Sequence, residues 1–320
     1  ILMGILGYSV TFIMFGFATQ LWMLYIFRIA GGIFACATMP TAMAYVGDTS
    51  SMEKRGSAMG MIGAAMGMGM VFGPAIGGIL SGISLAFPFT FAGLLALLNA
   101  ISVWILLPES LPSDKRIIRQ VERASLIEGL KSPLVVLFLF IFLASIGESI
   151  HHGTFALFAG GKLSFTARDI GWAFTTAGIV MAIIQGFLVG RLINRLGEEK
   201  TALAGILIMG TSFGLFLYMY DILSSIIFMA VFSVGVGLIR PSISAAVSKR
   251  TVTGQGAAMG ILNGYDSLGR AIGPMLGGLM LDWHLNFGYY TAITICLLAL
   301  VSLVKGSRKT QFAEFEDLAP

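Results

Sequence analysis

Residues 56–78 read GSAMGMIGAAMGMGMVFGPAIGG, an apolar, glycine-rich sequence that ends in Gly-Pro-x-x-Gly-Gly. Two hundred residues later, residues 256–278 read GAAMGILNGYDSLGRAIGPMLGG. The two stretches share their Gly-x-Ala-Met-Gly start and their Gly-Pro-x-x-Gly-Gly end. A match of this length indicates an internal repeat, and therefore a chain built from two related halves.

The repeat extends outward from these stretches. Gly4-Ile5-Leu6 matches Gly205-Ile206-Leu207, and Pro40 matches Pro241, both at an offset of 201. Each glycine-rich copy also has glycines spaced by four, which lie on one helix face and let another helix backbone approach closely in a membrane. The positions expected to set this packing are Gly69, Gly73, Pro74, Gly77 and Gly78 in the first copy, and Gly273, Pro274 and Gly277 in the second.

The composition excludes a soluble globular protein. Of the 320 residues, 57% are hydrophobic and only 11% are charged, whereas soluble domains carry roughly 25% charged residues. The net charge of +4 comes from basic residues in short loops between apolar runs, so it does not indicate nucleic-acid binding. Cys36 and Cys296 lie far apart inside apolar runs, where we expect small core residues and neither a disulfide nor a metal site.

Ten apolar segments have about the length that crosses a hydrocarbon core of about 30 Å, so we expect ten transmembrane helices. The segments are approximately 1–19, 22–47, 57–80, 87–107, 133–158, 170–190, 201–220, 222–247, 257–282 and 287–304. Fifteen of the 20 lysine and arginine residues fall in one set of loops together with the C-terminal flank, and two in the other set. This asymmetry assigns the first set to the cytoplasm.

The longest loop separates the two halves. We expect the remainder of an N-terminal half over residues 1–107, a charged cytoplasmic linker over 108–132, a six-helix C-terminal half over 133–306 and a cytoplasmic tail over 307–320. Thr166-Ala-Arg-Asp169 before the sixth segment predicts a capping box, which marks a helix start.

Several motifs resemble the major facilitator superfamily, a family of transporters with two six-helix halves. GMGMVFGPAIGG resembles the motif of the family's fifth helix in proton-coupled exporters, and Arg28-Ile-Ala-Gly-Gly32 resembles its fourth-helix motif. Residues 190–200 resemble a loop motif through Gly190, Asn194, Arg195 and Gly197, with asparagine where the family usually has aspartate. Asp48, Glu53, Arg55 and Gly56 resemble the short loop after the fourth helix. The resemblance is strongest to the drug:proton antiporter branch of tetracycline and multidrug exporters.

The resemblance implies a helical bundle of two pseudo-symmetric halves, of whose twelve transmembrane helices the ten segments are helices three to twelve. Residue 1 then follows the first-half copy of the 190–200 loop, and about 70 residues with helices one and two would precede it. It also implies that the glycine- and proline-bearing helices tune a rocking between inward-open and outward-open states.

Charged residues at mid-membrane depth are costly, and are functional candidates by default. Glu148 in the fifth segment and Arg28 in the second are expected at similar depth on helices that line the family's central cavity. The hypothesis is that Glu148 accepts a proton or contacts a cation, and that Arg28 biases the pKa of Glu148 or of an acid on the preceding helix one. A packing role for Glu148 is the alternative.

Further ionisable residues have both structural and functional interpretations. Asp266 and Arg270 are spaced by four and are expected to pair along one helix face. Arg240 is expected to extend toward the cytoplasmic membrane surface. His152 is expected to share a face with Glu148, either as a proton relay or, with His151, as an outer-interface pair.

An adaptable pocket for apolar compounds is expected to include Met66, Met70 and Phe155, with the polar residues Gln185 and Asn263 in the same cavity. The predicted function is secondary active efflux of drugs or other small apolar or cationic molecules, driven by protons across a bacterial cytoplasmic membrane. The alternatives are a sugar or siderophore transporter, and an inactive truncated membrane remnant. No enzyme activity, cofactor, metal or nucleic acid is expected; the expected partners of the monomer are the lipid bilayer, protons and a small-molecule substrate.

Overall fold

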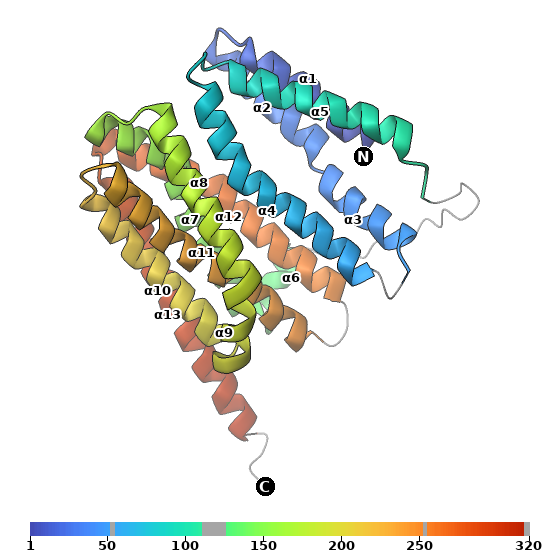
Figure 1. The fold of residues 1–320 in the computed structure, drawn as a ribbon. Coiled ribbons are helices and arrows are strands. Elements are labelled where there is room, and N and C mark those ends of the chain that lie inside the picture. Colours follow the sequence, from blue (N-terminus) through green and yellow to red (C-terminus); the bar gives the residue numbers. More distant parts are fainter. Residues whose placement is uncertain (52–54, 111–125, 252–254, 317–320) are drawn as a thin grey trace. The chain divides into compact units, whose positions relative to one another are not determined.

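The computed structural model describes residues 1–51, 55–110, 126–251 and 255–316. Every element within these residues is a helix, as expected for an all-α membrane protein (Figure 1). The chain divides into two compact units, Ile1–Gln120 (unit 1) and Val121–Pro320 (unit 2), each described by itself below.

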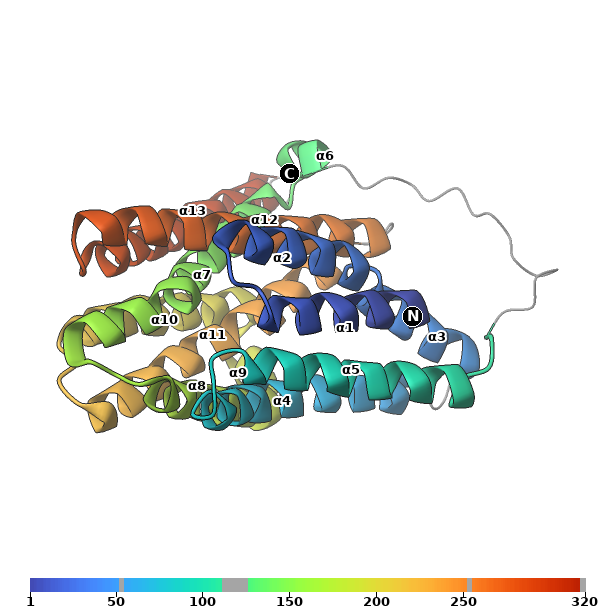
Figure 2. The ribbon, with the colours of Figure 1, turned by 90° about the horizontal axis from the view of Figure 1, so that it is seen from above.

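Unit 1 is built around α1, which packs against α2 and α5. Figure 2 shows α5 between α1 and α4, in agreement with the contacts that α5 makes with both. The buried Ser9 hydroxyl on α1 donates a hydrogen bond of 2.7 Å to the Gly93 carbonyl on α5, which fixes the register of these two helices. The helices are α1 (Leu2–Gly16), α2 (Leu21–Ala35), α3 (Thr38–Thr49), α4 (Arg55–Leu80) and α5 (Phe87–Leu106).

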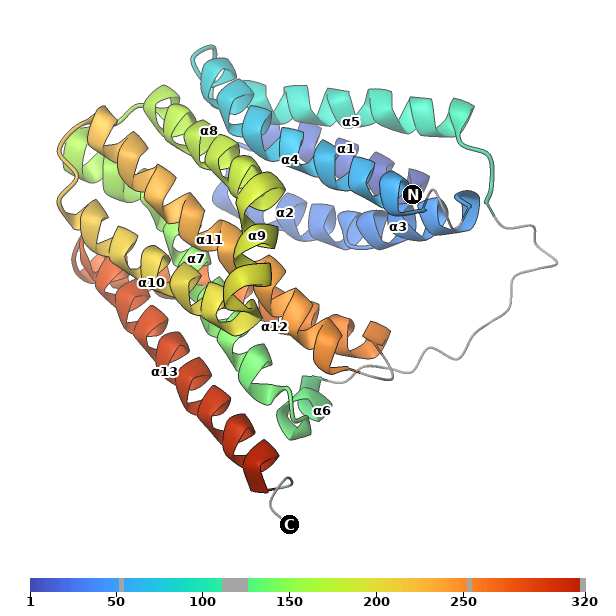
Figure 3. The same cartoon turned by 60° about the horizontal axis from the view of Figure 1, so that its bottom comes forward.

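Unit 2 is organised around α7, which packs against α8, α11, α12 and α13. Figure 3 shows α10 beside α11 and α13, which it also contacts. The elements are α6 (Leu126–Lys131), α7 (Val135–Leu163), α8 (Ala167–Ile183), the π-helical η2 (Ile184–Leu188), α9 (Val189–Leu196), α10 (Glu198–Leu217), α11 (Ile222–Arg250), α12 (Gln255–Trp283) and α13 (Phe287–Glu316).

Each predicted apolar segment is helical over most of its described residues. Among the described helices, seven are long and apolar enough to cross a membrane, judged by length and composition. They are Leu21–Val46, Phe87–Leu106, Val135–Leu163, Ala167–Leu196, Glu198–Leu217, Ile222–Arg250 and Phe287–Gly306. Many large apolar side chains on these helices are exposed, among them Trp104 at 75%, as lipid-facing surfaces require. The chain is therefore a multi-pass membrane protein, while the count of ten spans stays a prediction.

One predicted segment is interrupted. The run from 22 to 47 is divided into α2 and α3 at Cys36 and Ala37. Pro40 lies four residues after Cys36 and cannot donate a hydrogen bond to the Cys36 carbonyl, which weakens the helix at this point. The proline alone does not determine the break, because α11 continues through the matching Pro241.

The structure supports the internal repeat at the level of single contacts. α10 packs against α11 and α13, as its counterpart α1 packs against α2 and α5. A Cβ atom added at Gly4 would lie 2.8 Å from the Phe34 carbonyl oxygen, and one added at Gly205 would lie 2.9 Å from the Gly235 carbonyl oxygen. Both pairs are related by the offset of 201 found in the sequence. The close approach of α1 to α2 is therefore repeated in the approach of α10 to α11.

The glycine face predicted for α12 is a packing surface. Cβ atoms added at Gly269, Gly273 or Gly277 would lie 2.6–2.7 Å from atoms of α7, so only glycine permits this separation. Pro274 continues the same surface, because a Cβ added at Gly153 on α7 would lie 2.9 Å from its ring. The packing prediction is confirmed for this helix.

In α4 the packing role of the matching glycines stays a prediction. A Cβ atom at Gly69, Gly73 or Gly77 would meet no atom of the described structure within 4 Å. Gly73 and Gly77 line instead a cavity of about 670 Å³ between α4 and α5. Pro74 and Gly78 also lie within α4.

Three local predictions have clear outcomes. The capping box before α8 is confirmed, because the Thr166 hydroxyl accepts from the Asp169 backbone N–H while the Asp169 carboxylate accepts from the Thr166 backbone N–H. Cys296 is buried as expected. The core prediction was wrong for Cys36, which is exposed at the end of α2.

Candidate functional site

Five ionisable side chains and one serine meet inside unit 2, on three helices that pack together. We call them the charged cluster: Ser145, Glu148 and His152 on α7, Arg240 on α11, and Asp266 and Arg270 on α12. Positions 145, 148 and 152 lie on one face of α7 because they are three and four residues apart. Both carboxylates and Ser145 are largely covered, whereas the arginines are about half exposed.

Asp266 is the most strongly bound member of the charged cluster. Its Oδ1 accepts a hydrogen bond of 2.6 Å from the Ser145 hydroxyl and one of 3.3 Å from Arg270 Nε. Its Oδ2 lies 3.1 Å from Arg240 Nη1. The aspartate is 4% exposed and joins three helices. A buried carboxylate needs such partners to offset its loss of hydration.

Glu148 is bound more loosely than Asp266. Its Oε2 lies 3.8 Å from Arg270 Nη2, and its Oε1 lies 4.0 Å from His152 Nδ1. Both separations allow charge attraction but exceed the usual hydrogen-bond range. Glu148 therefore makes no short hydrogen bond to Arg270 or His152.

The charged cluster lies well inside the helices. Glu148 follows the first residue of α7 by 13 residues, about 20 Å along the axis, and Asp266 follows the first residue of α12 by 11 residues, about 16 Å. Two arginines and two carboxylates cancel in formal charge when His152 is neutral. Mutual neutralisation makes four such groups tolerable at this depth.

The cluster contains two residues that the sequence interpretation placed elsewhere or missed. Arg240 was expected to extend to the membrane surface, and this was wrong, because Asp266 on the neighbouring helix attracts it. Ser145 was not a candidate, although its position three residues before Glu148 on one face offered a signal. The predicted pairs of Arg270 with Asp266, and of His152 with Glu148, are present.

His151 is not at an outer interface, in contrast to the expectation for a histidine pair. It is 0% exposed and surrounded by aromatic rings, including Phe216 at 4.7 Å and Phe232 at 4.3 Å between centroids. Its Nδ1 lies 3.2 Å from the Tyr289 hydroxyl and its Nε2 lies 3.4 Å from Met229 Sδ. Sulfur is only an acceptor, so this arrangement favours a proton on Nε2 and donation from Tyr289 to Nδ1.

The predicted substrate-pocket residues do not form one group. Phe155 is 0% exposed and packs in the core beside His151 and Phe174, so its assignment to an open cavity was wrong. Asn263 is exposed and accepts a hydrogen bond of 3.2 Å from Arg240, which attaches it to the charged cluster. Met66 is 50% exposed on α4 of unit 1, and the side chain of Met70 lies outside the described residues.

Gln185 is exposed within the π-helical η2. Such one-turn widenings of a helix are frequent at functional positions. Ile184 in the same turn packs against Gly237, where an added Cβ would lie 3.0 Å from its Cγ2. Gln185 thus lies on a segment that contacts α11 one turn before Arg240, and its role in a cavity stays a prediction.

Arg28 lies on α2 of unit 1 and is exposed. Among the described residues it makes no hydrogen bond or ion pair. The hypothesis that Arg28 acts on Glu148 joins the two units and stays a prediction.

The motif of residues 190–200 was expected to be a loop and is mostly helix. Gly190, Asn194 and Arg195 lie in α9, and Gly197 ends it with φ of +85°, a conformation that favours glycine. α10 begins at the next residue, so Gly197 makes the whole turn. The first two residues of α10 bind the end of α11 through Glu198 with Lys249 at 3.3 Å and Glu199 with Arg250 at 2.5 Å.

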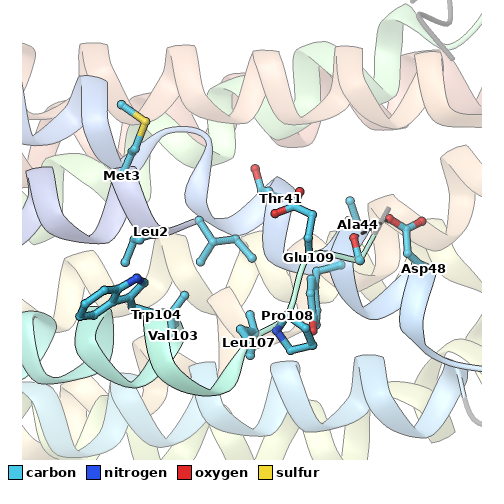
Figure 4. A pocket seen from close by; sticks show the side chains of 13 residues that line it. Leu2, Met3, Thr41, Ala44, Asp48, Val103, Trp104, Leu107, Pro108 and Glu109 are labelled. Atoms are coloured by element: carbon cyan, nitrogen blue, oxygen red, sulfur yellow. Dashed lines mark hydrogen bonds between the residues drawn. The ribbon is translucent and has the colours of Figure 1, made fainter. Parts of the chain in front are cut away.

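Unit 1 contains a cavity of about 490 Å³ between α1, α3 and α5 (Figure 4). Asp48 and Glu109 supply carboxylates to its lining, and Trp104 supplies an aromatic surface. Ser110 donates a hydrogen bond of 3.2 Å to Asp48, which ties the end of α3 to the chain after α5.

Known proteins resemble the chain along nearly its whole length. Multidrug resistance protein 2 of Bacillus subtilis is 30% identical over 306 residues, which cover 94% of this chain and 76% of that protein. Multidrug resistance protein 1 of the same bacterium is 32% identical, with 95% and 78% covered. The quinolone resistance protein NorA of Staphylococcus aureus is 26% identical over 301 residues, with 94% and 78% covered.

Solved structures share the fold at lower identity. A bacterial homologue of the human lysosomal transporter Spinster, in an inward-facing occupied conformation, has a TM-score of 0.76 at 14% identity, with 96% of this chain and 81% of that chain covered. The human organic anion transporter MFSD10 has a TM-score of 0.66 at 23% identity, with 94% and 76% covered.

The sequence model of the Major Facilitator Superfamily matches residues 1–146 and 137–316. This match spans both units and includes every helix that carries the charged cluster. Together with the repeated helix contacts and the relatives at 30% and 32% identity, it identifies the chain as a member of the Major Facilitator Superfamily.

Proposed function

We propose that the protein exports drugs or other small organic molecules across the bacterial cytoplasmic membrane in exchange for protons. Membership of a transporter family supports transport, and the names of the relatives, multidrug resistance proteins and a quinolone resistance protein, support drugs as the cargo. The bacterial relatives support the cytoplasmic membrane as the location. The working unit in this proposal is a monomer in the lipid bilayer.

The observation that carries the proposal is that the two carboxylates of the charged cluster differ in how closely their partners contact them. Asp266 is held by three short contacts, whereas the nearest charged partner of Glu148 is 3.8 Å away. Protonating Asp266 would weaken contacts to three side chains on three helices. Protonating Glu148 would release only the attraction of Arg270 and His152, so Glu148 is the proposed proton acceptor.

Exchange follows from competition for the Glu148 carboxylate. A proton neutralises it, and a cationic substrate requires it to be charged, so the two occupy the site in turn. Alternation of the bundle between inward-open and outward-open states would then couple inward proton flow to outward substrate flow. We also propose that Arg28 takes part in proton coupling.

The second part of the proposal concerns the helices that carry the glycine and proline motif and their role in the change of state. α12 contacts α7 through Gly269, Gly273 and Gly277, and the same two helices carry Asp266 and Glu148. A change in the charged cluster is therefore transmitted directly to a close helix interface. We propose that this interface adjusts as the transporter changes state.

The test is a drug-susceptibility panel in bacteria that lack their own exporters and express the protein. We expect increased resistance to several cationic or apolar compounds, and loss of that resistance with a proton uncoupler. Glu148→Gln should abolish proton-driven export, because glutamine cannot cycle between charged and neutral forms. Unchanged susceptibility to every compound would contradict drug export, and uncoupler-resistant export would contradict proton coupling.

A further inference from the structure

The charged cluster also exposes two guanidinium groups. The side chains of Arg240 and Arg270 are 50% and 44% exposed, whereas the side chains of Asp266 and Glu148 are only 6% and 14% exposed. The cluster is neutral in sum, but its carboxylates are covered and its arginines are accessible. The accessible part is therefore positive.

Hydrogen-bond donors remain on both arginines. A guanidinium has five N–H groups. Arg240 uses Nη1 toward Asp266 and Nη2 toward Asn263, and Arg270 uses Nε toward Asp266. The 3.8 Å between Arg270 Nη2 and Glu148 is too long for a hydrogen bond. Within the described part of the chain, no other acceptor takes the remaining N–H groups.

The depth of the cluster limits what can bind there. Arg240 precedes the last residue of α11 by 10 residues, about 15 Å along the helix. Arg240 also pairs there with the buried Asp266, so the occupant considered is a substrate inside the protein. Guanidinium groups bind carboxylates through paired, charge-assisted hydrogen bonds.

We propose that Arg240 and Arg270, together with the exposed amide of Asn263, form a subsite for the carboxylate group of a transported molecule. This inference deepens the proposed transport function and rests on it. The proposed substrates then include molecules with a free carboxylate. The carboxylate would bind Arg240 and Arg270, and a cationic group of the same molecule would bind Glu148. Arg240 and Asn263 then determine specificity, because they distinguish a free acid from its ester.

The test uses two probes that differ only at the carboxylate: a cationic rhodamine dye with a free carboxylate, and its methyl ester. Affinity is measured by fluorescence anisotropy with the purified protein in lipid nanodiscs. Arg240→Gln combined with Asp266→Asn removes one positive and one negative charge, so the cluster stays neutral. This double variant should lower affinity for the free acid about tenfold and leave affinity for the ester within about twofold.

Two further variants separate specificity from folding. Asn263→Leu removes an acceptor and donor without changing charge, and should reduce affinity for the free acid only. Arg168→Gln removes an exposed positive charge at the start of α8, away from the cluster, and should change neither affinity. Thermal unfolding of each variant identifies any that are misfolded.

The outcomes distinguish the two proposals. Binding of the ester with no binding of the free acid, or free-acid binding that is unchanged in both cluster variants, would overturn the carboxylate subsite while drug transport stands. Binding of neither dye would overturn the subsite and count against drug transport as well. A loss of affinity restricted to the free acid supports the subsite.

Discussion

The Ser145 hydroxyl lies 2.6 Å from Asp266 Oδ1 and joins α7 to α12 at mid-helix. The bond is short because the helices are close: a Cβ added at Gly269, three residues after Asp266, would lie 2.6 Å from the Phe142 carbonyl oxygen, three residues before Ser145. The glycine face and the charged cluster are therefore one structural feature, in which close backbone approach allows a buried carboxylate to be satisfied.

Asp266→Asn should be strongly destabilising. The substitution leaves Arg240 and Arg270 without their closest counter-charge inside the protein, and breaking a buried pair from one side costs about 3–5 kcal/mol, with the lower end expected because both arginines are half exposed. Unfolding in detergent by circular dichroism measures the effect.

The matched control for this prediction is the double variant Arg240→Gln/Asp266→Asn. It removes both charges of the pair, so its loss of stability should be smaller than that of Asp266→Asn alone. A double variant as unstable as the sum of the two single variants would show that the two residues do not interact energetically.

Glu148→Gln should change stability little while it abolishes proton coupling. Glu148 has no short hydrogen bond to Arg270 or His152, so its neutralisation should cost less stability than that of Asp266. Reconstituted vesicles with an imposed proton gradient measure dye movement with and without the gradient. A variant that keeps gradient-dependent transport, or one that unfolds as readily as Asp266→Asn, would contradict the assignment of the two carboxylates to different roles.

His151→Phe should destabilise unit 2 although it keeps an aromatic ring in place. The buried Tyr289 hydroxyl would lose its hydrogen-bond partner, at a cost of about 1–3 kcal/mol. His151→Phe combined with Tyr289→Phe removes both polar groups and should recover most of that loss. Chemical unfolding of the single and double variants tests this, and a double variant less stable than His151→Phe would show that the hydrogen bond does not explain the effect.

The sequence was sufficient to predict the helical fold, since apolar runs of about 20 residues in a chain with 11% charged residues leave few other structures. It also predicted the pair Asp266–Arg270, because four-residue spacing on one helix is a local geometric fact. Arg240 was misplaced because its partner is on another helix, and no pattern within α11 reveals which neighbour faces it.

The same limit explains the errors at His151 and Phe155. Both lie on α7 near polar residues, and the sequence does not state which face of α7 is turned into the core. In the structure the face with Ser145, Glu148 and His152 carries the cluster, while His151 and Phe155, four residues apart, lie on the aromatic core face. Helix rotation is set by packing against several neighbours at once, which a single-helix pattern does not contain.

Gly273→Ala and Gly278→Ala should have opposite effects on stability, although they are the same substitution five residues apart in α12. At Gly273 the new Cβ would lie 2.6 Å from Ser149 Cβ and 2.7 Å from the Ile146 carbonyl oxygen, so α7 and α12 would have to separate. Overpacking of this kind costs about 1–3 kcal/mol. At Gly278 no described atom lies within 4 Å of the new Cβ, and alanine in a helix is favoured over glycine by up to about 1 kcal/mol. Gly273→Ala should therefore unfold at a lower temperature than the parent protein, and Gly278→Ala at a higher temperature.

Because separation of these helices also moves Ser145 away from Asp266, Gly273→Ala should additionally reduce export activity, whereas Gly278→Ala should not. Equal unfolding temperatures for the two variants would show that the glycine face of α12 is not a close-packed surface.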